Sequence, residues 1–198
     1  MKLDIYFPTP VWWEDYQINN DEILNLCYRL REEDSKGRKI SNIGGWQSND
    51  MGPDEHKELK PLVDIIKKNS TLVLEQYGFD LNRCYLTIGN LWININNEND
   101  SNSIHTHTGC FLSGTYYVKA SRNNSPIVFY KNFTEDFAIT AAGDLARYTQ
   151  LSGSTARYQP KVGRLLMFPA WLPHGVLPNE TKDERISIAF NMKMRTYE

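Results

Sequence analysis

Cysteine, histidine and long apolar runs are scarce in this sequence, which has three cysteines and four histidines among 198 residues. Cys27, Cys84 and Cys110 are odd in number and unpatterned, which argues against a disulfide framework or a CxxC metal site. No apolar run reaches the ~18 residues of a membrane span. The N-terminal segment MKLDIYFPTPVWW has an acid and prolines where a signal peptide has an apolar core. We therefore expect a protein of the reducing cytoplasm that has no membrane partner.

An excess of one charge is also lacking. The 22 basic and 24 acidic residues give a net charge of −2 with interspersed signs, so no nucleic-acid partner is expected. The content of 40% hydrophobic and 12% aromatic residues indicates a globular, β-rich chain rather than a disordered one. The length suits one domain that buries a sizeable core. We expect a single domain over residues 1–198.

The first eighty residues are predicted to be helical behind a short strand. The sequence LDIYF, PTP and VWW predicts an edge strand interrupted by prolines. Asn20 and Asp21 are suited to cap a first helix. A second helix is predicted to begin near Pro53, with Pro61 as a late start or a kink, and to end at Gly78.

From Cys84 onward the apolar residues alternate, which is typical of strands. Seven or eight strands are predicted in the segments CYLTIGNLWININ, FLSGTYYVKA, PIVFY, TARYQ, RLLMF, HGVL and RISIAFNMKM. The predicted fold class is therefore mainly β with flanking helices. We expect a double-stranded β-helix (a cupin-like jelly roll) over residues 84–198, with the helices of residues 1–80 packed on its outer face.

Three of the four histidines lie in two short segments that suit a metal site. His105 and His107 are at i and i+2, which places both on one face if they share a strand. His174 follows an apolar strand and a proline-flanked turn. Neutral imidazole is the commonest ligand for first-row metals, so the sequence predicts a mononuclear metal site of these three residues. For His105 and His107 alone, two solvated histidines on an exposed face would be an equally good explanation.

Polar residues of the neighbouring strands add an anion-binding group to this prediction. Arg185 starts the segment RISIAFNMKM, and its guanidinium fork matches a carboxylate bidentately; a surface ion pair with Asp183 or Glu184 is the alternative. Ser187 shares its face and could donate a further hydrogen bond, or fill the barrel as a small inward residue. The amides of three residues are either site-lining or satisfied barrel-interior groups: Asn94, Asn96 and Asn191.

The segments WININ, IHTHTGCFLSGTYYV, GRLLMFPAWLPHGVLPN and RISIAFN together resemble the 2-oxoglutarate- and Fe(II)-dependent oxygenases. The resemblance is strongest to a family of small members found in bacteria and cyanophages, and IYFPTPVWW and SNIGGWQSND extend it over nearly the whole chain. The site layout is similar to the prolyl-hydroxylase branch, in which a strand with a Tyr-Tyr pair follows the first metal motif. For a phage-encoded protein, the compartment would be the host cytoplasm.

The resemblance implies Fe(II) as the metal, 2-oxoglutarate and O2 as co-substrates, and hydroxylation of peptidyl proline or a small metabolite with release of succinate and CO2. It makes His105 the first ligand, His174 the distal ligand and Arg185 the partner of the 2-oxoglutarate C5 carboxylate. Tyr117, the matching member of the Tyr-Tyr pair, would reach the same carboxylate; a buried hydroxyl bonded to backbone is the alternative. Tyr116 has the opposite parity and should pack against the other sheet or the helices.

One position departs from the superfamily, whose first motif is His-x-Asp or His-x-Glu. His107 stands at the carboxylate position, so it either ligates the metal itself or leaves a position open, which Glu98 or Asp100 could fill. Three other classes could use this set of residues: a 2-oxoglutarate-independent three-histidine cupin dioxygenase, a zinc hydrolase and a non-catalytic jelly-roll binding protein. Arg185 separates the favoured hypothesis from these rivals, because they have less need of an anion clamp.

The loops leave the substrate open. Residues 131–154 are either a lid or a surface excursion between strands. The segment Gly44-Gly45-Trp46 is either a mobile flap or a loop anchored by its tryptophan. A small molecule or a peptide is equally compatible with the sequence as substrate. A homodimer is compatible with it as well.

Overall fold

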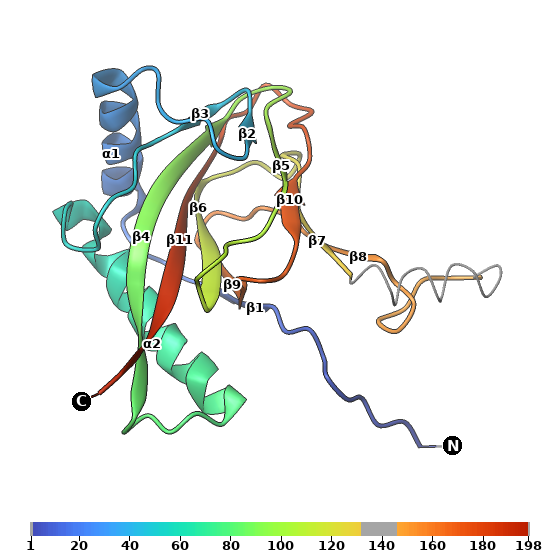
Figure 1. Ribbon diagram of the computed structural model, residues 1–198. Helices are drawn as coiled ribbons and strands as arrows, with labels where there is room; N and C mark the ends of the chain where they lie inside the picture. Colours follow the sequence, from blue (N-terminus) through green and yellow to red (C-terminus); the bar gives the residue numbers. More distant parts are fainter. Residues whose placement is uncertain (1, 132–145, 198) are drawn as a thin grey trace.

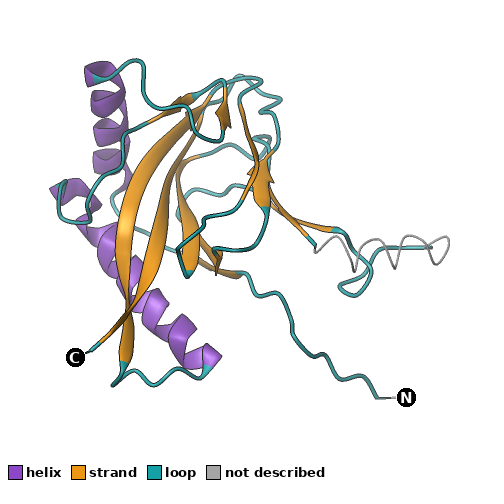
Figure 2. Ribbon diagram, viewed as in Figure 1, coloured by secondary structure: helices purple, strands orange, loops and turns teal. Residues whose placement is uncertain are grey.

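The computed structural model describes residues 2–131 and 146–197, and it contains two antiparallel sheets (Figures 1 and 2). The first sheet has six strands in the order β1 (Trp12–Asp15), β9 (Arg164–Pro169), β6 (Leu112–Lys119), β11 (Arg185–Thr196), β4 (Cys84–Asn96) and β3 (Trp46–Gln47). The second has five strands in the order β2 (Asn42–Ile43), β5 (Ser101–His105), β10 (His174–Val176), β7 (Ile127–Tyr130) and β8 (Thr155–Tyr158). The predicted fold class, a jelly roll with flanking helices, is confirmed.

The long strands β4 and β11 form the centre of the six-stranded sheet. They pair from Arg185 opposite Asn96 to Thr196 opposite Cys84, with one irregularity after Asn191. Alternation along each strand sends apolar residues to the helical face and polar residues to the other face. The sequence pattern of β4 and β11 therefore decides which side chains face the interior between the two sheets.

Two helices cover the outer face of the six-stranded sheet, α1 (Asn20–Glu33) and α2 (Lys60–Tyr77) (Figure 1). Apolar residues of both helices pack against the sheet, among them Ile23 of α1 and Ile66 of α2. Tyr116 is fully buried on this side, and its hydroxyl donates to Asn20 Oδ1 at 2.8 Å. The packing predicted for Tyr116 from its parity is thereby confirmed.

An ionic network also holds α1 to the sheet. The Glu184 carboxylate accepts hydrogen bonds from Tyr28 and Arg31 of α1 and from Lys119 of β6, at 2.7 to 3.0 Å. Burial by itself raises the pKa of Glu184, but these hydrogen bonds outweigh it and lower the pKa to about 2. These hydrogen bonds hold the Glu184 carboxylate on the helical side of the six-stranded sheet.

Several predicted boundaries near the N-terminus were wrong. Residues 2–11 form no strand, and only Trp12–Asp15 pairs, as an edge strand against β9; a proline has no N–H to donate to a ladder. The helix predicted near Pro53 begins later, with a short 3-10 turn, η1 (Lys57–Leu59), followed by α2 with Pro61 in its first turn. Its end at Gly78, with φ of 80°, is as predicted.

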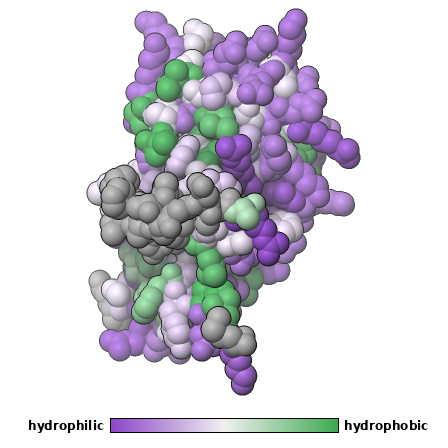
Figure 3. All heavy atoms as spheres, turned by 90° about the vertical axis from the view of Figure 1, so that its right-hand side faces the viewer, coloured by the Kyte–Doolittle hydropathy of each residue, from purple (hydrophilic) through white to green (hydrophobic). Residues whose placement is uncertain are grey.

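The surface carries apolar residues in separate areas. On the face shown in Figure 3, hydrophilic residues lie between the apolar areas. The N-terminal segment runs away from the body (Figure 1).

Among the described residues, no helix is long and apolar enough to cross a membrane. Of the segment 131–154 that was predicted as a lid or an excursion, residues 132–145 lie outside the described residues.

Candidate metal centre and anion pocket

His105 and His174 come from neighbouring strands of the five-stranded sheet. His105 is the last residue of β5, and it pairs with His174, the first residue of β10. His107 lies beyond the strand, where its N–H donates to the Ala170 carbonyl at 2.9 Å. The expectation that His105 and His107 share one strand face was therefore wrong, because the ladder ends at His105. The loop nevertheless turns His107 toward the other two histidines.

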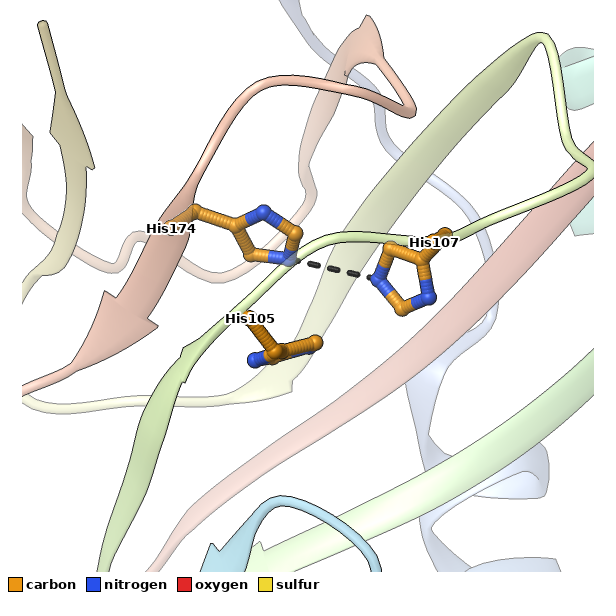
Figure 4. Close-up of side chains that lie close together, drawn as sticks. All are labelled: His105, His107 and His174. Atoms are coloured by element: carbon orange, nitrogen blue, oxygen red, sulfur yellow. Dashed lines mark hydrogen bonds between the residues drawn. The ribbon is translucent and has the colours of Figure 1, made fainter. Parts of the chain in front are cut away.

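The three imidazoles form one cluster (Figure 4). One ring nitrogen from each of His105, His107 and His174 lies within 4.8 Å of the others. The closest pair is His107 Nε2 and His174 Nε2 at 3.3 Å. This spacing is that of three nitrogens that can surround one ion.

Backbone carbonyls set the orientation of two of the rings. His105 Nδ1 lies 2.8 Å from the Ser103 carbonyl, and His174 Nδ1 lies 2.8 Å from the Leu172 carbonyl. A carbonyl oxygen can only accept, so each Nδ1 carries the proton and each Nε2 keeps its lone pair. This arrangement prepares Nε2 of both residues to bind a metal.

The local environment keeps His107 and His174 neutral. Burial lowers the pKa of His174 to about 3, and burial followed by the proximity of His105 lowers the pKa of His107 to about 4. Both rings are therefore in the form that binds a metal at neutral pH. The alternative ligands do not join them: Glu98 is exposed, and Asp100 accepts a hydrogen bond from the Asn97 N–H at 2.7 Å.

Arg185 carries a positive charge in the interior of the described structure. It is 2% exposed, its Nη1 donates to Asn96 Oδ1 at 3.3 Å, and its guanidinium lies 5.1 Å from the centroid of the Tyr117 ring. Within the described residues no carboxylate pairs with it, since Asp183 is exposed and Glu184 binds other cations. Arg185 Nε and the Tyr117 hydroxyl are both buried, and neither has a hydrogen-bond partner in the described part of the chain. Together they leave a buried donor set that fits an anion.

The histidines and Arg185 line one pocket of about 450 Å³, part of it open to solvent. Its remaining lining residues include neutral polar and aromatic side chains from both sheets: Ser41, Trp92, Asn94, Asn102, Thr115, Phe168 and Ser187. No acidic residue lines the pocket among the described residues.

The remaining predicted site residues divide into two groups. Ser187 and Asn94 line the pocket, and Asn94 Oδ1 is buried without a hydrogen-bond partner among the residues that the structure describes. Asn96 and Asn191 do not line it: Asn96 contacts Arg185 instead, and Asn191 accepts the Ser113 hydroxyl at 2.7 Å as a satisfied interior amide.

Sequence reasoning missed several walls of the pocket. Trp92 has the same parity as Asn94 on β4, and this parity could have predicted that it lines the pocket. The centroid of its ring lies 5.7 Å from that of the His107 ring.

Of the two alternatives for the segment Gly44-Gly45-Trp46, the structure favours the anchored loop. Trp46 is 7% exposed and its Nε1 donates to the Asp34 carbonyl at 2.7 Å.

Comparisons with known proteins agree with this geometry. A family described as "Putative 2OG-Fe(II) oxygenase" matches residues 90–191. This part of the chain contains the three histidines of the cluster and Arg185. No curated protein sequence matches the chain.

Solved structures share the fold at low sequence identity. A prolyl-4-hydroxylase of Pseudomonas putida has 14% identity over 93% of both chains and a TM-score of 0.64. A prolyl hydroxylase of Trichoplax adhaerens, solved with a hypoxia inducible factor peptide, has 14% identity over 92% of this chain and 83% of its own, with a TM-score of 0.63. The carbocyclase SnoK of nogalamycin biosynthesis has 10% identity over 93% and 79%, and a TM-score of 0.63.

Proposed function

Because the chain belongs to the 2OG-Fe(II) oxygenase family and is thus an oxidoreductase, we propose that it binds Fe(II) through His105, His107 and His174 and hydroxylates a small molecule or peptide at the expense of 2-oxoglutarate. In this proposal Arg185 holds the C5 carboxylate of 2-oxoglutarate. Ser187 and Tyr117 assist it.

A single observation carries the proposal: the guanidinium of Arg185 is buried in the pocket of the histidines, and no carboxylate of residues 2–131 or 146–197 pairs with it. A buried charge without compensation costs several kcal/mol. Such an arrangement is expected where a ligand brings the missing charge. The unpaired Arg185 Nε and Tyr117 hydroxyl are two donors for one carboxylate.

The donor set fits the metal as well. Three imidazole nitrogens can occupy one face of an ion and leave positions for a bidentate co-substrate and oxygen. The usual facial triad of such oxygenases has a carboxylate, and here His107 takes its place. When bound, Fe(II) and 2-oxoglutarate supply the oxidative decarboxylation that turns O2 into an oxidant for a C–H bond.

The residues of this chain position the reactants. His105 and His174 are oriented through their Nδ1 protons, so their Nε2 atoms need no rearrangement to bind. Arg185 lies on the six-stranded sheet, whereas His105 and His174 lie on the five-stranded sheet, and a molecule that spans the interior contacts both sides. The aromatic walls, Trp92 and Phe168, keep water away from the reacting groups.

The function is tested by anaerobic titration of the Fe(II)-loaded protein with 2-oxoglutarate. We expect the weak visible charge-transfer band of the chelate in the wild type and its loss in His174→Ala. Metal binding without the band would contradict the role of 2-oxoglutarate and favour a three-histidine cupin or hydrolase. Absence of metal binding in the wild type would refute the metal centre altogether.

A further inference from the structure

The charges of the pocket do not cancel. A histidine that ligates a metal is neutral, so a divalent ion held by three imidazoles keeps its full charge of about +2. Arg185 adds one positive charge, and the described lining contains no acidic residue. The dianion 2-oxoglutarate offsets two of these charges. One net positive charge therefore remains once metal and co-substrate are in place.

Two carboxylates close to these residues in the sequence are engaged elsewhere. Glu184 immediately precedes β11 and binds Lys119 and Arg31 on the helical side. Asp100 closes the turn after β4 by accepting the Asn97 N–H. Neither lines the pocket, so neither neutralises the centre from within.

Because the pocket is buried, the remaining positive charge is weakly screened and acts strongly on a bound molecule. Arg185 and Ser187 are each 2% exposed and His174 is 5% exposed, so the interior of the pocket is screened far less than the surface. A site with a carboxylate at position 107 would be neutral in the same state. The replacement of that carboxylate by His107 thus changes what the loaded pocket attracts.

We propose that the substrate of this protein is an anion, a small molecule whose carboxylate offsets the remaining charge beside the metal. The inference rests on the proposed function. Apart from Arg185 and the histidines, the polar lining is neutral and includes Asn94 and Thr115. The buried pocket is shared with 2-oxoglutarate, and its lining comes from the interior faces of the two sheets, which favours a small molecule over a folded partner.

The first test isolates the charge at position 107. His107→Asp and His107→Asn are isosteric and differ by one charge. Each protein is loaded with Co(II) and saturating 2-oxoglutarate and titrated with azide, and binding is followed in the visible spectrum. We expect saturable azide binding in the wild type, a dissociation constant within a few-fold in His107→Asn, and one at least tenfold weaker in His107→Asp. Equal affinities in the two variants would overturn the proposal.

The second test uses the wild type alone, so it does not depend on variants that fold poorly. Acids and their amides of equal shape (acetate and acetamide, benzoate and benzamide) are compared by thermal shift on the loaded protein. The acids should raise the melting temperature and the amides should not; equal shifts would contradict the inference. Calorimetry of 2-oxoglutarate binding separates the two claims, because failure there refutes the proposed function, whereas binding without any preference for anions refutes only the anionic substrate.

Discussion

Replacing Arg185 by glutamine should separate binding of 2-oxoglutarate from binding of metal. The guanidinium is 2% exposed and has no carboxylate partner among the described residues. Charge-assisted hydrogen bonds contribute about 1.5–3 kcal/mol each. Losing two of them corresponds to at least about 3 kcal/mol, or a roughly 100-fold weaker dissociation constant for 2-oxoglutarate. Metal affinity should change little, because His105 and His174 lie on β5 and β10 and His107 lies in the loop after β5, none of them on β11 with Arg185.

The effect on the unliganded protein should have the opposite sign. Truncating a buried side chain normally destabilises, yet removing an uncompensated buried cation relieves its desolvation cost. We therefore expect Arg185→Gln without ligand to be at least as stable as the wild type. Arg38→Gln is a matched control that should leave 2-oxoglutarate binding intact. It breaks a surface ion pair in which Arg38 Nη1 lies 2.7 Å from Asp50 Oδ2.

A thermal-shift assay reads both effects. At a ligand concentration of about 100 times the dissociation constant, the wild type gains about 2.7 kcal/mol, which is roughly 5–10 °C for a chain of this size. At the same concentration the variant should gain only about 0.4 kcal/mol, or about 1–2 °C. A shift equal to that of the wild type would refute the assignment of Arg185 as the anion clamp. A large loss of stability without ligand would show that the guanidinium has a structural partner instead.

Three further predictions concern the metal ligands and the fold. Because burial lowers the pKa of His174 to about 3 and of His107 to about 4, the metal-free fold binds fewer protons than the unfolded chain, so its free energy of unfolding should fall as pH drops below about 6.5. Urea unfolding between pH 7 and 4 measures this, and His174→Gln should flatten the profile. Glu184→Gln should cost about 1–2 kcal/mol in urea unfolding by loosening α1, without changing 2-oxoglutarate affinity. Gly114→Ala should destabilise by about 1–3 kcal/mol, because a Cβ there would lie 2.2 Å from Phe190 Cζ; unchanged stability would contradict the packing.

The sequence predicted the parts of the structure that depend on alternation. The alternation of apolar and polar residues from Cys84 onward predicted the strands of the two sheets. The parity along β11 predicted that Arg185 and Ser187 share one face, and both line the pocket. It could not predict the path of the chain after β5, because the end of a ladder depends on which strand lies opposite. His107 was therefore assigned to a strand although it lies in a loop.

Side-chain partners were the other limit of the sequence. Asn96 and Asn191 have the same parity as the pocket residues, and yet each amide is engaged by a neighbouring side chain. Which amide contacts a ligand depends on distances of an ångström or two across the interior. Alternation along a strand contains no such information.

The position of His107 in a loop also explains how the site can differ from the usual triad without a change of fold. His105 and His174 are fixed twice, by the pairing of their strands and by their Nδ1 hydrogen bonds to backbone carbonyls. His107 is held through its backbone, by its N–H to Ala170 and its carbonyl to Cys110. In the described structure the one hydrogen-bonding partner of its ring is His174. Position 107 is thus the place where this architecture can exchange one ligand for another, and with it the charge of the pocket, while the remaining ligands and Arg185 keep their places.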